Sequence, residues 1–362
     1  MELENIINRF DTFIPAYQSD SRNFQDYVLD IMAEYKKVIL DANLYGSEIK
    51  AYTIEETDLK IRIDQISDGL NKTINHFFNV SRVDGGALNN LTKVIKDAKL
   101  FANHSLHFRT NELSLYRLRG HDKTKHTDAY ERKEIFHLPF EMANEASTMR
   151  YSLNGVPCLY VANSVYVAWE EMRKGRKEYA VSLFKNQSPL YFVELDSTPF
   201  HKRKYENDND KYDDLIDYAM LFPIILCSSL KVKDDDEKNA FKPEYMIPQL
   251  LLECSKSDFI GIRYISTRVD EQTEGIFWNY AIPVKTVNKT TGYCERLKRV
   301  FTLSEVKIFD FCNPTDKSSF TSFKPNEDII RVFELGMHHD FCNTIFSGIE
   351  HELHLLPQDI DF

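Results

Sequence analysis

The sequence predicts an α+β protein in which a helical N-terminal region precedes a mixed or antiparallel sheet. Up to about residue 105, apolar side chains recur at steps of three and four, the spacing of an amphipathic helix. After about residue 108, short runs of β-branched and aromatic residues are separated by turns. Few helical stretches alternate with these runs, which argues against a doubly wound parallel sheet.

The helical region is predicted from two apolar stripes and one break. The first stripe contains Phe24, Val28, Ile31, Met32, Tyr35, Val38 and Ile39. The second contains Leu59, Ile63, Ile66, Leu70, Ile74 and Phe77, and it follows Thr53-Ile-Glu-Glu56, which has the form of a capping box. A third helix is expected after Gly85-Gly86. We expect the stripes to face a core, with a partner-binding groove as the alternative.

Six short runs are expected to form strands: 114–119, 157–162, 190–195, 259–265, 277–284 and 305–311. Helices are expected at 164–173 and 245–254. Two highly charged inserts, 203–214 and 231–238, are expected to be solvated loops, because dense charge stays in water. We therefore expect three regions: helices over 1–107, a sheet domain over 108–311, and a C-terminal extension over 312–362 that packs on the sheet domain.

Length and composition exclude several classes of protein. A chain of 362 residues has room for about two domains, and 45 basic against 56 acidic side chains give a net charge of −11, which disfavours binding to nucleic acid. The start of the chain lacks the pattern of a signal peptide, and the longest apolar run, Ala219 to Cys227, is too short to cross a membrane. The six cysteines form no C-x-x-C pair. We expect reduced thiols, no membrane span and a cytoplasmic location.

Several common site motifs are absent from the sequence. It contains neither of the two common glycine-rich phosphate-binding loops and no G-x-S-x-G. Histidines and one cysteine gather near the C-terminus, at His338, His339, Cys342, His351 and His354. Their spacing does not match a zinc site, so we expect no metal and a surface or helix-packed histidine cluster instead.

The residues that can carry chemistry lie between 115 and 171 and near 266. On the strand 115–119, alternation places Arg117 and Arg119 on one face, a fork suited to a pyrophosphate. On the helix after Ser164, Glu171 flanks the apolar stripe at the edge of a cleft, and Glu170 is expected to be solvated.

Five short sequence blocks in this chain resemble those of the RES domain, a family named for its Arg, Glu and Ser, in their order and local sequence. The blocks are Tyr116-Arg117, Arg150-Tyr-Ser, Gly155-Val-Pro-Cys-Leu-Tyr160, Ala168-Trp-Glu-Glu171 and Gly261-Ile-Arg-Tyr-Ile-Ser266. Residues 241–253 also resemble the stretch before the serine strand in longer members. The resemblance covers about residues 110–310, more than half of the chain.

The resemblance implies a split sheet of the ADP-ribosyltransferase type and an enzyme that degrades NAD, typically the toxin of a bacterial toxin–antitoxin pair. NAD would be the substrate, with no further cofactor, and an antitoxin protein would be the partner. Carried over residue by residue, Glu171, Arg117 and Ser266 would be catalytic, and Arg150 and Tyr160 would bind NAD. Arg119 competes with Arg117 for the family's first arginine, and the short toxin members lack the helical front.

Elementary chemistry agrees with these roles. Breaking the nicotinamide–ribose bond develops positive charge on the sugar, and nicotinamide leaves as a neutral amide, so no general acid is needed. Glu171 would hold the ribose hydroxyls and face this charge. The arginines would clamp the pyrophosphate, Tyr160 would pack on the nicotinamide ring and Ser266 would hydrogen-bond the substrate.

Other functions remain open at this point. Water or phosphate could be the acceptor, or the fold could transfer ADP-ribose to a macromolecule. The sheet could also be an inactive scaffold whose helical front binds a partner. The front or the tail, 358–362, could cover the cleft from within the chain.

Overall fold

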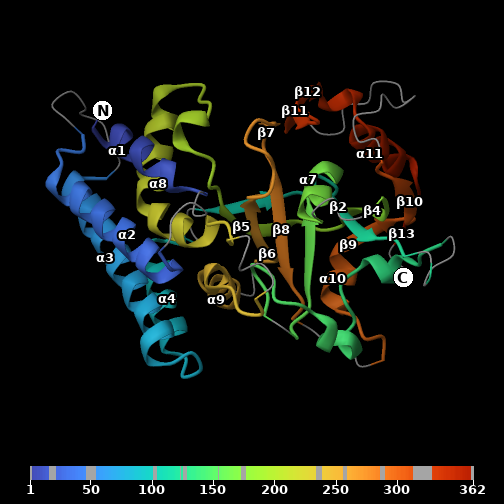
Figure 1. Ribbon diagram of the computed structural model, residues 1–362, viewed down its shortest axis with the longest axis horizontal. Helices are drawn as coiled ribbons and strands as arrows, with labels where there is room; N and C mark the ends of the chain where they lie inside the picture. Colours follow the sequence, from blue (N-terminus) through green and yellow to red (C-terminus); the bar gives the residue numbers. More distant parts are fainter. Residues whose placement is uncertain are drawn as a thin grey trace. The chain divides into compact units, whose positions relative to one another are not determined.

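The computed structural model describes residues 2–15, 22–45, 54–100, 104–122, 124, 129–153, 155–172, 177–233, 239–255, 259–285, 290–312 and 328–359 (Figure 1). The chain divides into two compact units. Residues 1–105, 148–151 and 195–256 form the helical unit, and residues 106–147, 152–194 and 257–362 form the sheet unit. Residues 195–256, which the sequence places with the sheet, thus fold with the N-terminal helices.

Two of the first three helices of the helical unit form where the sequence predicts an apolar stripe. The α1 helix spans Glu2–Phe10, α2 spans Phe24–Asp41 and α3 spans Glu56–Asn75. The predicted stripes supply the buried sides of α2 and α3. The predicted capping box includes Thr53, which lies outside the described residues, and the N-cap of α3 is Glu55 instead.

The two remaining predicted helices of this unit are also present. The α4 helix (Gly86–Asp97) follows Gly85, whose φ of 77° is a left-handed conformation that glycine adopts without strain. The α9 helix (Met246–Cys254) occupies the predicted range 245–254.

The α8 helix (Asp208–Ser229) corrects the expectation of a solvated loop at 203–214. The helix begins with Asn207, whose side chain accepts a hydrogen bond of 3.0 Å from the backbone N–H of Asp210. Arg203, just before the helix, is paired rather than solvated. Its Nη1 lies 2.8 Å from Asp214, and its side chain is only 12% exposed. The other predicted loop, 231–238, lies partly outside the described residues.

The last part of α8 contains Pro223, which lacks the N–H that a helix needs. The carbonyl of Ala219, four residues earlier, therefore loses its helical partner. The hydroxyl of Tyr35, on α2, donates a hydrogen bond of 2.7 Å to this carbonyl. The helix is held to α2 at the position where its own ladder is interrupted.

The sheet unit is built on a ten-stranded sheet with the order β1-β5-β6-β8-β3-β2-β4-β9-β13, in which β10 also pairs with β4. The strands that match the predicted runs are β2 (Ser114–Gly120), β3 (Cys158–Ala162), β5 (Leu190–Leu195), β6 (Gly261–Ile265), β8 (Trp278–Pro283) and β10 (Lys307–Asp310). Those that sequence reasoning missed are β1 (Ser105–Phe108), β4 (Glu178–Asn186), β9 (Phe301–Ser304) and β13 (Gln358–Asp359).

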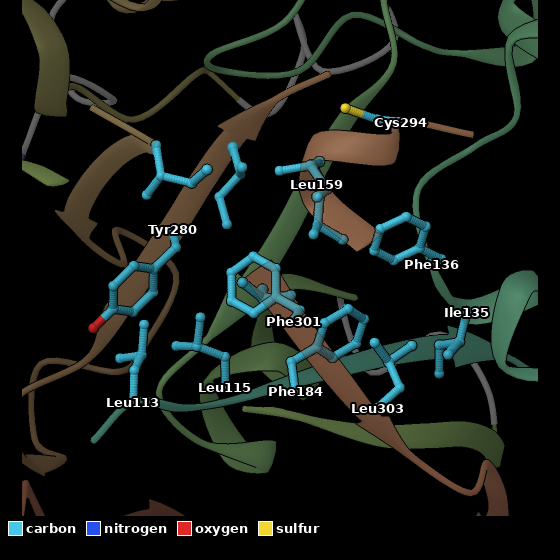
Figure 2. Packing of buried hydrophobic residues seen from close by; sticks show 14 of the residues in the cluster. Leu113, Leu115, Ile135, Phe136, Leu159, Phe184, Tyr280, Cys294, Phe301 and Leu303 are labelled. Carbon is cyan, nitrogen blue, oxygen red and sulfur yellow. The ribbon is translucent and has the colours of Figure 1, made fainter. Parts of the chain in front are cut away.

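The two faces of this sheet are covered by different cores. One core contains Leu115, Leu159, Phe184 and Phe301, together with Phe136 from the segment after β2, as Figure 2 shows. The other contains Tyr116 and Leu118 with the apolar residues of helices α7 (Val165–Glu171) and α11 (Ile345–Leu355). Successive residues of β2 thus alternate between the two cores, as a strand requires.

The sheet is split between β2 and β3. These strands share one register pair, Tyr116 with Ala162, whereas β3 pairs with β8 over all five of its residues, from Cys158 to Ala162. On its other side β2 pairs with β4 along its whole length. The observed fold is therefore the α+β arrangement that the sequence predicts, with helices in the N-terminal region and a split sheet after it.

The C-terminal residues belong to the sheet unit. A small antiparallel sheet joins β12 (Met337–Asp340), β11 (Ile329–Glu334) and β7 (Glu274–Gly275). The α11 helix packs on α7, and β13 pairs with β9. Gln358 and Asp359 of the predicted covering tail are thus strand residues at a sheet edge, and residues 360–362 lie outside the described part.

Candidate active site

The candidate site is centred on Glu171, the last residue of α7. The chain leaves β3 at Ala162, and Ser164 begins α7 by accepting a hydrogen bond of 2.9 Å from the backbone N–H of Tyr166. The helix is short and its residues 165–170 are buried. Because α7 follows β3 directly, the chain enters the helix at the end of a sheet strand.

The carboxylate of Glu171 is held by three side chains from other parts of the sequence. Its Oε1 accepts hydrogen bonds of 2.6 Å from Ser266 Oγ and 2.6 Å from Asn279 Nδ2. Its Oε2 lies 3.2 Å from Arg268 Nε, and 32% of the Glu171 side chain is exposed. The group is therefore fixed in orientation and still reachable from solvent.

The sheet brings these partners together. Asn279 on β8 lies opposite both Ala162 of β3 and Tyr264 of β6. Ser266 follows β6, and its backbone N–H donates 2.7 Å to the carbonyl of Phe277. Ser266 Oγ also accepts a hydrogen bond of 3.2 Å from the backbone N–H of Arg268. The turn after β6 thus fixes Ser266 and Arg268 against the same carboxylate.

Tyr160 lies on the same face of the sheet as Asn279. In register it is opposite Ala281, two residues from Asn279 on β8, so the two side chains are diagonal neighbours. The Tyr160 hydroxyl donates a hydrogen bond of 3.1 Å to Ser152 Oγ. The aromatic ring of Tyr160 is therefore a diagonal neighbour of Asn279, which holds Glu171.

Arg117 and Arg119 share one face of β2, as predicted, but that face is opposite to the one that bears Asn279. Arg117 lies on the side of Leu115, whereas Tyr116 lies opposite Ala162, which in turn faces Asn279. The structure does not bring the two arginines to Glu171.

The surroundings of the two arginines differ, and of the two only Arg119 is exposed. Nη1 of Arg117 is buried and has no hydrogen-bond partner among the described residues. Burial lowers the pKa of the Arg117 guanidinium to about 10. Arg119 Nη1 donates 2.6 Å to the carbonyl of Glu134.

Arg150 belongs to the helical unit, whereas Glu171 belongs to the sheet unit. Its Nη1 donates 2.9 Å to the carbonyl of Ser228 and its Nη2 donates 3.0 Å to the carbonyl of Leu230, at the end of α8. Its guanidinium also lies over the ring of Tyr245, 5.3 Å from the centroid. Within its own unit, Arg150 holds the end of a helix.

Glu170 is buried, not solvated as its position opposite the apolar stripe suggests. It is 7% exposed. Burial raises the pKa of the neighbouring Tyr166 hydroxyl, and the Glu170 carboxylate adds to this shift. Residues 165–170 of α7 are all buried, so the side of the helix opposite the apolar stripe is covered by protein as well.

Two partners of Glu171 were missed by sequence reasoning. Arg268 stands two residues after Ser266, and the strand candidate at 277–284 contains Asn279. Alternation along that strand could have indicated that Asn279 and Ala281 share a face. It could not have indicated that Glu171 of α7 lies over this face.

Among the C-terminal histidines, His354 packs against the sheet. His354 Nε2 lies 3.0 Å from the hydroxyl of Tyr116, and burial lowers the pKa of His354 to about 4. In the described part of the chain, no three His, Cys, Asp or Glu side chains are grouped so that they could hold a metal ion. The helices described here also include none that is long and apolar enough to cross a membrane.

The chain is similar to one curated protein of Bacillus subtilis (strain 168), which bears the name "Putative toxin YopC". The two are 30% identical over 254 residues, which make up 63% of this chain and 54% of that protein. The chain therefore spans about half the length of the curated relative that it matches. No family model and no solved structure matches the chain.

Proposed function

We propose that this chain is a toxin-like enzyme that cleaves the bond between nicotinamide and ribose in NAD. The observation that carries the proposal is the fixed carboxylate of Glu171, which Ser266 and Asn279 hold by hydrogen bonds of 2.6 Å each. The name of the B. subtilis relative supports the toxin role. The resemblance of the sequence blocks to the RES domain supports NAD as the substrate.

The geometry around Glu171 suits a reaction that develops positive charge on a sugar. Two donors occupy Oε1, so the carboxylate cannot rotate freely, and Oε2 is the oxygen that can accept a hydrogen bond from a ribose hydroxyl. A preorganised negative group stabilises an oxocarbenium-like transition state without reorganisation during the reaction. Nicotinamide departs as a neutral amide, so Glu171 need not supply a proton.

The other residues on this face fit the remaining parts of NAD. Tyr160, on the same face of the sheet as Asn279, offers an aromatic surface for the nicotinamide ring. Arg268, beside Oε2, supplies a guanidinium that can hold a diphosphate oxygen once NAD binds. This role replaces the one that the sequence assigns to Arg117 and Arg119, which project from the opposite face.

An enzyme that drains a central cofactor must be restrained in the cell that makes it. The proposal therefore includes a neutralising protein partner, which the resemblance implies. Water and phosphate are both suitable acceptors for the ribosyl cation, and they give different products.

The test is to incubate the purified chain with NAD in buffers with and without phosphate and to identify the products by NMR. We expect free nicotinamide, together with ADP-ribose or its 1-phosphate. Intact NAD after prolonged incubation with the purified chain would contradict the proposal. In a bacterial lysate, ADP-ribose attached in stoichiometric amounts to a protein would show the alternative activity, transfer to a macromolecule.

A further inference from the structure

We propose that Glu350, a buried carboxylate on α11, is a positioning residue that sets the place of Glu171 by fixing the start of α7. This inference rests on the proposed function for its effect on activity. The α11 helix belongs to the C-terminal extension, to which the sequence assigns no functional residue.

Glu350 reaches the first turn of α7 directly. Its Oε1 accepts a hydrogen bond of 2.8 Å from the backbone N–H of Val165, the first residue of α7. Its carboxylate also has a side-chain hydrogen bond with Ser164, which itself caps the helix by accepting from the N–H of Tyr166. The first N–H groups of a helix have no partner within the helix, so this contact supplies one of the missing acceptors.

The burial of Glu350 is costly, which argues for a specific role. Glu350 is 0% exposed. Its Oε2 has no hydrogen-bond partner among the described residues, and none of the ion pairs found there includes Glu350. A buried carboxyl group with an unpartnered oxygen costs free energy whether it is charged or protonated, and an apolar residue of similar volume would fill the same space without that cost.

The same face of α11 also packs along α7. Phe346, one turn before Glu350, lies 5.0 Å from Tyr166 and 5.1 Å from Trp169 between ring centroids. The aromatic contact limits sideways movement of α7, and the hydrogen bond to Val165 fixes its position along the helix axis. Polar and apolar contacts from one helix thus define the placement of the other.

The position of α7 decides whether Glu171 meets its partners. Glu171 lies six positions after Val165, which is about 9 Å along the helix. Ser266 and Asn279 are also held by the sheet and by the turn after β6. A small shift of α7 would therefore lengthen the two hydrogen bonds of 2.6 Å to Glu171 Oε1.

The test compares Glu350→Ala and Glu350→Gln in the full chain by hydrogen exchange of the α7 amides and by NAD turnover. We expect Glu350→Ala to speed exchange across 165–171 at least about tenfold and to lower kcat at least about tenfold, with KM within about threefold. Glutamine keeps an acceptor oxygen for the N–H of Val165. Glu350→Gln should therefore keep the exchange rate of the α7 amides and kcat within about threefold of wild type. Glu352→Gln, on the same helix, is the matched control and should change neither.

Two results would overturn the inference. One is α7 exchange in Glu350→Ala that equals wild type. The other is an increase that is equally large in β2, β3 and β4, which would indicate general destabilisation. If Glu350→Ala does not fold, Glu350→Asp, which withdraws the carboxylate by one methylene, takes its place with the same expectations. If the wild-type chain consumes no NAD, the proposed function fails, but the exchange comparison still decides whether Glu350 positions α7.

Discussion

Ser266 donates a hydrogen bond of 2.6 Å to Glu171 across a separation of 95 residues, so the turn after β6 and the end of α7 meet at one carboxylate. The serine has two roles in this contact. It orients Glu171, and it accepts the N–H of Arg268, which brings the guanidinium to the other carboxylate oxygen. A residue that organises two charged groups should matter more for rate than for stability.

Replacing Ser266 with alanine should therefore reduce NAD turnover at least about tenfold while changing the free energy of unfolding by less than about 1.5 kcal/mol. The loss follows from freeing the carboxylate, not from unfolding. Steady-state kinetics and urea denaturation of the same preparation measure both quantities. Equal losses of activity in Ser266→Ala and in Glu271→Gln, a change at an exposed site, would show that the serine has no special role.

Arg117→Met should leave the protein as stable as wild type or stabilise it. Nη1 of the guanidinium is buried and lacks a partner among the described residues, and an apolar side chain of similar length avoids that cost. Thermal unfolding monitored by circular dichroism is the measurement. The same variant should keep its NAD turnover, because Arg117 projects from the face opposite Asn279. A large loss of turnover in a stable Arg117→Met protein would restore the role that the resemblance implies.

Arg150→Ala should destabilise the protein by about 1–3 kcal/mol, because the carbonyls of Ser228 and Leu230 lose charged donors at the end of α8. Chemical denaturation checks this value. Unchanged stability together with weaker NAD binding in calorimetry would instead favour Arg150 as the NAD-binding residue that the resemblance implies.

The titration of the buried Glu350 carboxyl should appear in the pH dependence of the protein's stability. Burial raises the pKa of its carboxyl to about 8, above the ordinary value of 4.5 in an unfolded chain. The folded protein then binds this proton more tightly than the unfolded chain, so the stability it confers is complete below pH 4.5 and is lost as pH rises towards 8.

Glu350→Gln lacks this proton and should therefore gain stability relative to wild type as pH increases from 5 to 8. Melting temperatures of both proteins across that range measure the difference. A constant difference between the two proteins over the whole range would show that Glu350 does not titrate there.

The sequence was most informative where one face of an element is buried and the other is not. The stripes of α2 and α3 and the alternation of β2 gave a readable period. It was least informative where an element is buried all round. In α8, every residue from Leu215 to Ser229 except Asp217 is buried, and β4 is buried on both faces, so neither shows a polar period.

The candidate site was predictable in part for the same reason. Glu171 and Ser266 stand in recognisable sequence blocks, and the structure joins them. The partners Asn279 and Arg268 depend on the register of β8 with β3 and on the turn after β6, which no local pattern encodes. The sequence did not reveal that Arg117 lies on the face opposite Asn279. Alternation within one strand defines two faces, but it does not say which of them bears the site.

In the proposed reaction, the fixed carboxylate of Glu171 stabilises the positive charge that develops on the ribose. The most direct measurement is the rate of NAD consumption by purified Glu171→Gln, compared with Glu271→Gln, which makes the same change at an exposed site in the same unit. We predict that Glu171→Gln loses at least about a hundredfold in rate while Glu271→Gln equals wild type. NAD consumption by Glu171→Gln at the wild-type rate would contradict a catalytic role for Glu171.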